Sequence, residues 1–277
     1  MSQLQDSAML AALNITQWSA RKHDKSVSDK VDQDNGAKDA GRYNKLLVDK
    51  TALEPCNQIA SAARAHLYKV TLPWGENGER LLPATLFFDF KNEMQTFESE
   101  FLNRVQTFVG LYPSLRENAR TRLGQLYQPK DYPLDHEVAD KFGFNIAITP
   151  VASADDFRVK LNDEYVESIK ADITARMQER QKDAVKDCWL RVRKVVTAMH
   201  ERLKDEKAVF KDSLIGNARE LIDILPALNL TNDPELTNIA TELQTILMPP
   251  DRLRQDKVLR ASTAAAADAI LARMPWA

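Results

Sequence analysis

One very long helical stretch near the middle of the chain constrains the fold most. Asn162 or Asp163 is suited to cap it, and apolar residues at a spacing of three or four follow to Ile173 and resume from Cys188 to Leu203. This pattern predicts a helix from 162 to about 206, which would be about 65 Å long at 1.5 Å per residue. That length exceeds the diameter of a compact domain of this size. We therefore expect the helix to project as one arm of an antiparallel coiled coil, or to pack against another chain.

The apolar face of this helix is the candidate self-association surface. It consists of two groups of seam residues, separated by the almost wholly polar run from Arg176 to Asp183. Seams with this spacing are typical of coiled coils. The predicted self-association residues are Val166, Ile169, Ile173, Cys188, Val192, Val195, Met199 and Leu203.

The remaining sequence predicts a mainly α-helical fold with a small antiparallel sheet. Apolar residues at helical spacing mark the region 88–127, where Tyr112-Pro113 is expected to interrupt the helix. Only 8 glycines in 277 residues argue against a large sheet with many turns. Short segments that alternate apolar and polar residues are typical of half-buried strands. The predicted strands are residues 13–18, 69–72, 142–149 and 157–161.

These elements suggest three consecutive parts. Residues 1–161 form a mixed α+β body, 162–207 the long helix, and 208–277 a C-terminal helical segment. Within the body, the charged stretch from Arg21 to Lys50 is interpreted as a solvated helix or a mobile arm. In the C-terminal segment, one helix is expected to end at Pro226, the next to begin at Asp233-Pro234, and the last to run from Arg252 to Met274.

Charge and hydropathy limit the partners. The chain has 38 Lys and Arg residues against 40 Asp and Glu, a net charge of -2, whereas a dedicated polyanion binder usually has a basic surplus. No stretch approaches the roughly 18 apolar residues of a membrane span, and the N-terminus lacks a secretory leader pattern. We expect a cytoplasmic protein with no membrane partner, in which Cys56 and Cys188 are buried and reduced.

The strongest local charge lies on the second half of the long helix. Between Arg180 and Lys204 there are eight basic and three acidic residues. One interpretation is a solvated flank that pairs with acids on a neighbouring helix; the alternative is contact with a phosphate backbone. The candidate nucleic-acid contacts are Arg180, Lys182, Lys186, Arg191, Arg193 and Lys194.

No known catalytic motif appears, so we expect neither an enzyme nor a cofactor. The densest set of potential metal ligands is Asp135-His136-Glu137, with Asp140 on the same face if the segment is helical. Acids placed at the start of a helix after Pro133 explain these residues more simply. A metal-dependent enzyme is the weakest of the alternatives.

The loop around Trp74 is the remaining candidate. Asn77-Gly78 favours a tight turn, and apolar residues flank it on both sides. Trp74 is interpreted as an anchor that packs on its own domain; the alternative is an exposed contact for a partner.

Several landmarks also occur in a characteristic order. They are Thr71-Leu72-Pro73-Trp74, the run from Gly78 to Pro83, Tyr112-Pro113 before the run from Ala119 to Gly124, Asp131-Tyr132-Pro133, Phe142-Gly143-Phe144, and the run from Asp156 to Val159. Over roughly residues 10–205 the chain thereby resembles a family of uncharacterised, mainly helical proteins carried by bacteriophages and related mobile elements. The resemblance implies a viral protein in the cytoplasm of an infected or lysogenic bacterial host, and it transfers no catalytic residue.

Together these observations predict a non-enzymatic, phage-encoded interaction or assembly protein. It would self-associate through its long helices as a homo-oligomer and could bind a host or phage protein. The alternative is a DNA-binding protein of phage recombination or replication.

Overall fold

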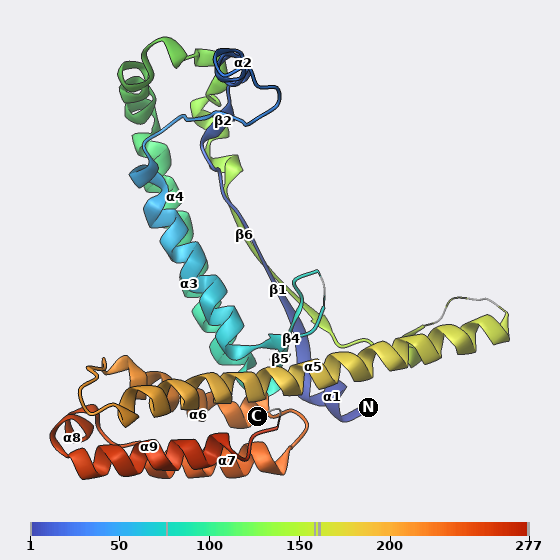
Figure 1. Ribbon diagram of the computed structural model, residues 1–277. Coiled ribbons are helices and arrows are strands. Elements are labelled where there is room, and N and C mark those ends of the chain that lie inside the picture. Colours follow the sequence, from blue (N-terminus) through green and yellow to red (C-terminus); the bar gives the residue numbers. More distant parts are fainter. Residues whose placement is uncertain (1, 76, 158, 160–161, 276–277) are drawn as a thin grey trace. The chain divides into compact units, whose positions relative to one another are not determined.

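The computed structural model describes residues 2–75, 77–157, 159 and 162–275. It is mainly helical with a small antiparallel sheet, which confirms the predicted fold class (Figure 1). The α-helices of the described residues are α1 (Ser2–Ser7), α2 (Lys25–Asp34), α3 (Glu54–Val70), α4 (Phe87–Leu123), α5 (Asp163–Lys204), α6 (Ser213–Leu228), α7 (Pro234–Ile246), α8 (Pro250–Gln255) and α9 (Lys257–Leu271).

The strands form one four-stranded and one two-stranded sheet. In the larger sheet the order is β4-β5-β1-β6, and β5 pairs antiparallel with both β4 and β1. In the smaller sheet β2 pairs antiparallel with β3. The strands are β1 (Ala8–Thr16), β2 (Arg21–His23), β3 (Asn44–Leu46), β4 (Leu72–Pro73), β5 (Arg80–Pro83) and β6 (Gly143–Pro150).

The chain folds into two compact units that differ from the three consecutive parts expected from the sequence. Unit 1 comprises Met1–Ala12, Tyr68–Phe90 and Ala147–Ala277, and unit 2 comprises Leu13–Leu67 and Lys91–Ile146. The chain passes between them inside α3, α4, β1 and β6. Each unit is therefore assembled from segments that are distant in sequence.

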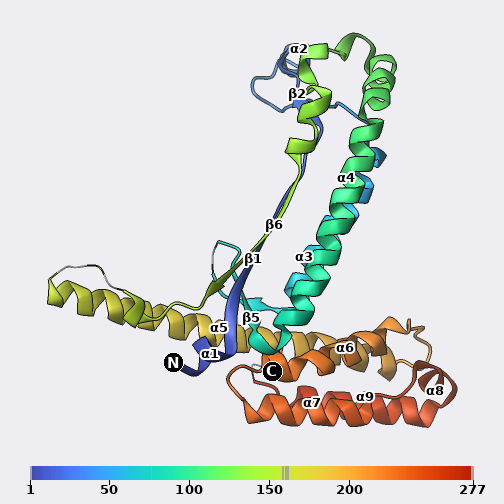
Figure 2. The ribbon, with the colours of Figure 1, turned by 180° about the vertical axis from the view of Figure 1, so that it is seen from behind.

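In unit 1, α5 is the predicted long helix. Asn162 caps it, since its side chain accepts a hydrogen bond from the Glu164 amide at 3.0 Å. The C-terminal half of α5 packs against α6 and α9, and α7 contacts both of these helices. In the two opposite views of Figures 1 and 2, the N-terminal half extends past the ends of α6, α7 and α9. None of its described side chains from Glu164 to Asp183 is buried.

In unit 2, α3 and α4 lie side by side around an aromatic core. Cys56 and Ala60 of α3 form one apolar cluster with Phe101 and Val105 of α4. A second cluster forms around Tyr112, whose hydroxyl donates to Pro133 O at 3.0 Å.

The predicted break at Tyr112-Pro113 is wrong, because α4 continues through Pro113. A proline inside a helix removes one backbone hydrogen bond and costs roughly 3 kcal/mol. The Tyr112 ring is fully buried and lies 5.8 Å from the Trp18 ring and 6.3 Å from the Phe108 ring. This packing offsets the cost of the proline. At the other end, α4 stops at Leu123, before the predicted end at 127.

The predicted strands are partly corrected. The strand expected at 142–149 is β6, which lies one residue later. The strand expected at 13–18 is β1, which begins earlier, because Ala8 to Ala11 pair with β5, and ends at Thr16. Lys69 and Val70 belong to the last turn of α3, whose apolar face continues to Val70. Thr71 lies in no helix or strand, and only Leu72 is in a strand. In 157–161, Phe157 and Val159 are in no strand, and the other three residues lie outside the described part of the chain.

The charged stretch from 21 to 50 is more ordered than an arm. It contains α2 together with the paired strands β2 and β3. Lys45 lies in β3, and its side chain is buried between two aspartates. A mixed-charge segment can therefore fold when one of its cations finds carboxylate partners.

Two of the three C-terminal expectations need correction. The helix α7 begins as predicted, with Asp233 capping it through the Glu235 amide at 2.9 Å. However, α6 continues through Pro226 to Leu228, because buried leucines on both sides of the proline hold its last turn in the core. The final helix is divided at Asp256, whose side chain caps α9.

Candidate functional site

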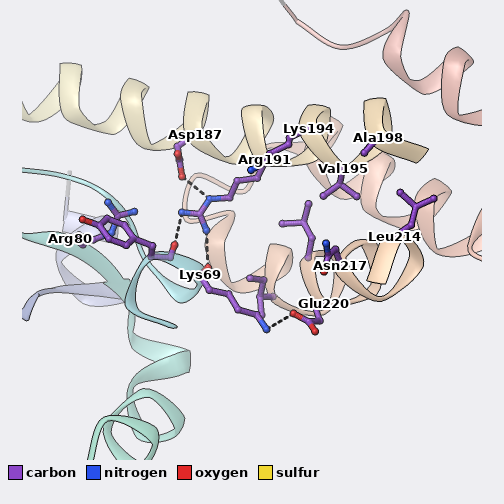
Figure 3. Close-up of a pocket in the computed structure, with 13 residues that line it drawn as sticks. Lys69, Arg80, Asp187, Arg191, Lys194, Val195, Ala198, Leu214, Asn217 and Glu220 are labelled. Atoms are coloured by element: carbon purple, nitrogen blue, oxygen red, sulfur yellow. Dashed lines mark hydrogen bonds and ion pairs between the residues drawn. The ribbon is translucent and has the colours of Figure 1, made fainter. Parts of the chain in front are cut away.

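The largest pocket described in unit 1 lies between α5 and α6, beside the end of α3 and the strand β5 (Figure 3). Its volume is about 560 Å³. We call it the α5–α6 pocket. It is lined by Tyr68, Lys69, Arg80, Asp187, Arg191, Lys194, Val195, Ala198, Leu214, Asn217, Glu220, Leu221 and Ile224.

Helical periodicity explains how the two walls form. Residues three and four apart share one face of a helix, so Asp187, Arg191 and Lys194 of α5 face the same hollow. On α6, positions 214, 217, 221 and 224 follow the same spacing. The apolar floor between the two helices consists of Val195, Ala198, Leu214, Leu221 and Ile224.

Arg191 fixes the wall of the pocket against the end of α3. The last carbonyls of a helix have no amide partner within it, and partial negative charge collects there. The guanidinium donates to Lys69 O at 2.7 Å, to Tyr68 O at 2.9 Å and to Thr71 O at 2.6 Å. Its Nε donates to Asp187 at 2.7 Å (Figure 3). Most of its N–H donors are thus used within the protein, and Arg191 is a structural group.

Arg80 differs because its hydrogen-bond partners are neutral. Its Nε donates to Thr71 Oγ1 at 2.7 Å and its Nη2 to Thr71 O at 3.2 Å. The guanidinium carbon also lies 4.4 Å from the centre of the Tyr68 ring. Burial lowers the pKa of Arg80, the charge of Arg191 lowers it further, and Asp187 opposes both. Among the described residues no carboxylate accepts a hydrogen bond from this guanidinium.

The charges around the pocket do not cancel. Lys69 pairs with Glu220 at 2.7 Å, and Asp187 is occupied by Arg191. Four cationic and two carboxylate side chains line the pocket, which leaves two positive charges in excess. The pocket therefore combines an apolar floor with a surplus of cations, an arrangement suited to a ligand that is both acidic and apolar.

The structure corrects the interpretation of the second group of seam residues. Cys188, Val192, Met199 and Leu203 are buried, and Val195 is half-buried, in clusters formed with side chains of α6, α7, α8 and α9. The chain's own helices cover this part of the seam, so it offers no surface to a second copy. The first group, Val166, Ile169 and Ile173, is half-buried.

Cys188 behaves as the buried apolar residue expected from its place in the seam. It is 1% exposed, and its Sγ lies 3.6 Å from Leu228 O. Burial raises the pKa of the Cys188 thiol to about 12. The nucleophilic thiolate is therefore scarce at neutral pH. Burial likewise raises the pKa of Cys56.

The basic flank of α5 is only partly available to a ligand. Arg191 is occupied by the end of α3, and Arg180 is half-buried. The other predicted nucleic-acid contacts, all exposed, are Lys182, Lys186, Arg193 and Lys194.

The candidate metal ligands do not converge. Asp135–Glu137 and Ala139–Lys141 form two separate 3-10 turns, where a continuous helix would be needed to place His136 and Asp140 on one face. Asp135 pairs with Arg116 at 2.8 Å, and Glu137 accepts from the Leu134 amide at 3.0 Å. The part of the chain that the structure describes contains no group of three or more His, Cys, Asp or Glu side chains placed to hold a metal.

Trp74 lies in the core of unit 1. Its side chain is 7% exposed and belongs to the same cluster as Leu72 and Leu81, which flank the turn. This placement agrees with an anchoring role and leaves little of the indole for a partner.

Sequence reasoning missed Lys69, Arg80 and Asn217 as pocket residues. The sequence held a weak signal for Arg80, because this arginine comes two residues after Gly78 and starts the strand that borders the pocket. Nothing in the sequence connects that strand with the pocket residues of α5, the first of which is Asp187.

Comparison of the chain with models of known protein families, with curated proteins and with solved structures finds no match. The resemblance to phage-carried proteins stays a prediction based on its landmarks. Among the helices that the structure describes, none is long and apolar enough to cross a membrane.

Proposed function

We propose that this chain is a non-enzymatic interaction protein whose α5–α6 pocket binds an acidic, partly apolar segment of a partner protein. One observation carries the proposal. The half-buried guanidinium of Arg80 has only neutral hydrogen-bond partners among the described residues and stands beside an apolar floor.

The chemistry of the pocket favours a ligand that carries both a carboxylate and apolar groups. A desolvated cation gains most from an anionic partner, and a guanidinium can hold a carboxylate through two parallel hydrogen bonds. The aliphatic floor would remove the apolar neighbours of that carboxylate from water, which contributes roughly 25 cal/mol per Å². A volume of about 560 Å³ lies in the usual range of ligand pockets and can take two or three side chains of a peptide.

The same residues favour binding over catalysis. The described residues that line the pocket include no Ser, Cys or His. The two carboxylates, Asp187 and Glu220, are each paired with a cation and so are poor general bases. This supports an interaction protein without a cofactor.

Nucleic acid is the weaker alternative for this pocket. A phosphate backbone is met by exposed cations and gains little from an aliphatic floor. Arg191, a central residue of the predicted basic flank, already donates to three backbone carbonyls.

We also propose self-association through the first half of α5. This half extends past the neighbouring helices of unit 1, and Val166, Ile169 and Ile173 keep the spacing of a coiled-coil seam (Figure 1). The viral setting, the cytoplasmic location and a host or phage partner belong to the same proposal and rest on the sequence landmarks.

The pocket is tested with a fluorescein-labelled peptide of alternating glutamate and leucine, followed by fluorescence anisotropy. We expect binding, and about tenfold weaker binding of the matching lysine–leucine peptide, a difference of about 1.4 kcal/mol. Lys194→Glu is expected to weaken binding of the acidic peptide about tenfold. Lys186→Glu makes the same charge change on the same helix outside the pocket and should have little effect. Equal affinity for both peptides, or equal loss in both variants, contradicts the proposal.

Self-association is tested by light scattering over a range of concentrations. The wild type is expected to exceed the 31.4 kDa of one chain. Ile169→Asp combined with Ile173→Asp should yield monomers, whereas Ala171→Asp combined with Ala175→Asp, at exposed positions of the same segment, should not. A wild-type monomer at every concentration contradicts self-association.

A further inference from the structure

Unit 2 contains a second hollow, which the proposed function does not use. Its volume is about 400 Å³, and it lies between β2, the start of α2, β3 and the 3-10 turn Pro129–Asp131. We call it the lysine hollow, after its lining residues Lys22, Lys25, Lys45 and Lys130. We propose that the lysine hollow binds the phosphate groups of a polyanionic ligand.

The floor of the hollow is fixed by a buried ion-pair network. Lys45 is 2% exposed, and its Nζ lies 3.0 Å from Asp24 Oδ2 and 2.7 Å from Asp131 Oδ2. The same ammonium donates to Leu126 O at 2.8 Å. The ammonium is therefore held by two carboxylates and one backbone carbonyl of the protein. The hydrogen bond from Lys45 is the main cause that lowers the pKa of Asp24 to about 2, so this carboxylate is ionised at neutral pH.

The rim of the hollow is cationic and unneutralised. Lys22, Lys25 and Lys130 are exposed, and none of them forms an ion pair with a described residue. Together with the floor, four lysines face two aspartates, which leaves two positive charges in excess. Because the Lys45 ammonium is already held by two carboxylates, the three rim ammonium groups remain to bind an anion from solution.

The residue types indicate phosphate as the anion. Lysine binds phosphate as a flexible point charge, and three lysines can approach several oxygens of one multiply charged group. The lining contains no aliphatic side chain, in contrast to the α5–α6 pocket, so an apolar acid would gain little here. The phosphate groups could belong to a free polyphosphate or to a nucleic-acid backbone, and both sources share this chemistry.

The proposal does not depend on the proposed function, because it concerns other residues in the other compact unit. The hollow also includes Lys22, Lys25 and Lys45 from the charged stretch between Arg21 and Lys50, which the sequence suggested was a solvated helix or an arm. A cationic hollow in this stretch is visible only once β2, β3 and the 3-10 turn are brought together.

The experiment is a calorimetric titration of the full chain with pyrophosphate at low salt. We expect saturable binding to the wild type that weakens as salt rises. Lys25→Gln combined with Lys130→Gln should weaken it at least about tenfold, about 1.4 kcal/mol. Lys30→Gln combined with Lys38→Gln removes the same charge from exposed positions of the same unit outside the hollow and should keep wild-type affinity. Circular dichroism melting of each variant checks that the fold is intact.

A second arm distinguishes the two sources. A labelled oligothymidylate that binds the wild type, is displaced by pyrophosphate and is lost in the Lys25/Lys130 variant identifies a nucleic-acid backbone as the ligand. Binding of pyrophosphate without binding of the oligonucleotide identifies a free polyphosphate. Absence of pyrophosphate binding, or equal weakening in the control variant, overturns the proposal.

Discussion

The two compact units hold their poorly exposed cations in different ways. In unit 1, Arg191 and Arg260 donate mainly to backbone carbonyls at the ends of helices. In unit 2, Lys45 is held by Asp24 and Asp131. Backbone carbonyls do not titrate, whereas carboxylates lose their charge in acid. The carbonyl contacts of Arg191 and Arg260 are therefore insensitive to pH, whereas the lysine network of unit 2 depends on it.

The largest expected effect concerns Arg260. This residue of α9 is 7% exposed, and it donates to Leu203 O at 3.1 Å, Arg202 O at 2.8 Å and Ala208 O at 2.7 Å. It thus holds the end of α5 and the turn that follows. Arg260→Met would leave these wholly or partly buried carbonyls without the guanidinium and should lower the free energy of unfolding by about 3 kcal/mol.

Urea unfolding measures this effect, and its size should be the same at neutral and mildly acidic pH. Arg252→Met, at an exposed position of the neighbouring α8, is the matched control and should change stability by about 0.5 kcal/mol or less. If the loss of unfolding free energy in Arg260→Met became smaller in acid, the two units would not differ in pH dependence as proposed.

The next effect concerns Asp24 in unit 2. Its pKa is about 2 in the folded protein, against 3.8 ordinarily, so its charge stabilises the fold. The sign follows from linkage, because a lowered pKa contributes stability that is present above about pH 4 and is lost as pH falls through about 2. Asp24→Asn should therefore cost about 2 kcal/mol at neutral pH.

The measurement is urea unfolding at neutral pH and near pH 3, with amide hydrogen exchange of unit 2 peptides as a second reading. The difference between wild type and Asp24→Asn should be smaller in acid. A variant as stable as the wild type at neutral pH would show that Lys45 needs only Asp131.

The helix α5 illustrates what could be predicted. Apolar residues three and four positions apart correctly predicted its approximate bounds and its apolar face. This periodicity is enough, because it places the apolar side chains on one side of the helix. The same pattern does not identify what covers the face. Val192 and Met199 are covered by the chain's own helices, while Ile169 has the same spacing and is only half-buried. An apolar stripe can pack on any apolar stripe of suitable size, whether in the same chain or in another.

The candidate site was less predictable for a related reason. The partners of Arg191 are main-chain carbonyls of Tyr68, Lys69 and Thr71, and a carbonyl is present in every residue. Basic residues on a helix flank are therefore equally compatible with capping another helix and with binding phosphate. The expectation that Pro113 interrupts the helix failed in a similar way, because the buried Tyr112 ring holds α4 in place. In both cases contacts distant in sequence override the local signal.

The smallest expected effect separates a structural arginine from a free cation. Arg191→Lys keeps the charge, but one ammonium cannot reproduce the fork that reaches Tyr68 O, Lys69 O, Thr71 O and Asp187 at once. Because the side chain is 19% exposed and water can replace part of what is lost, the expected cost is about 1 kcal/mol of unfolding free energy.

Urea unfolding should show this loss for Arg191→Lys, and hydrogen exchange should show weaker protection at the end of α3. Arg202→Lys, at an exposed position of the same helix, should show neither. If Arg191→Lys matched the wild type in both measurements, the guanidinium would not be needed at the end of α3. Arg191 would then join Arg80 as a cation available to a ligand, and unit 1 would resemble the lysine hollow of unit 2.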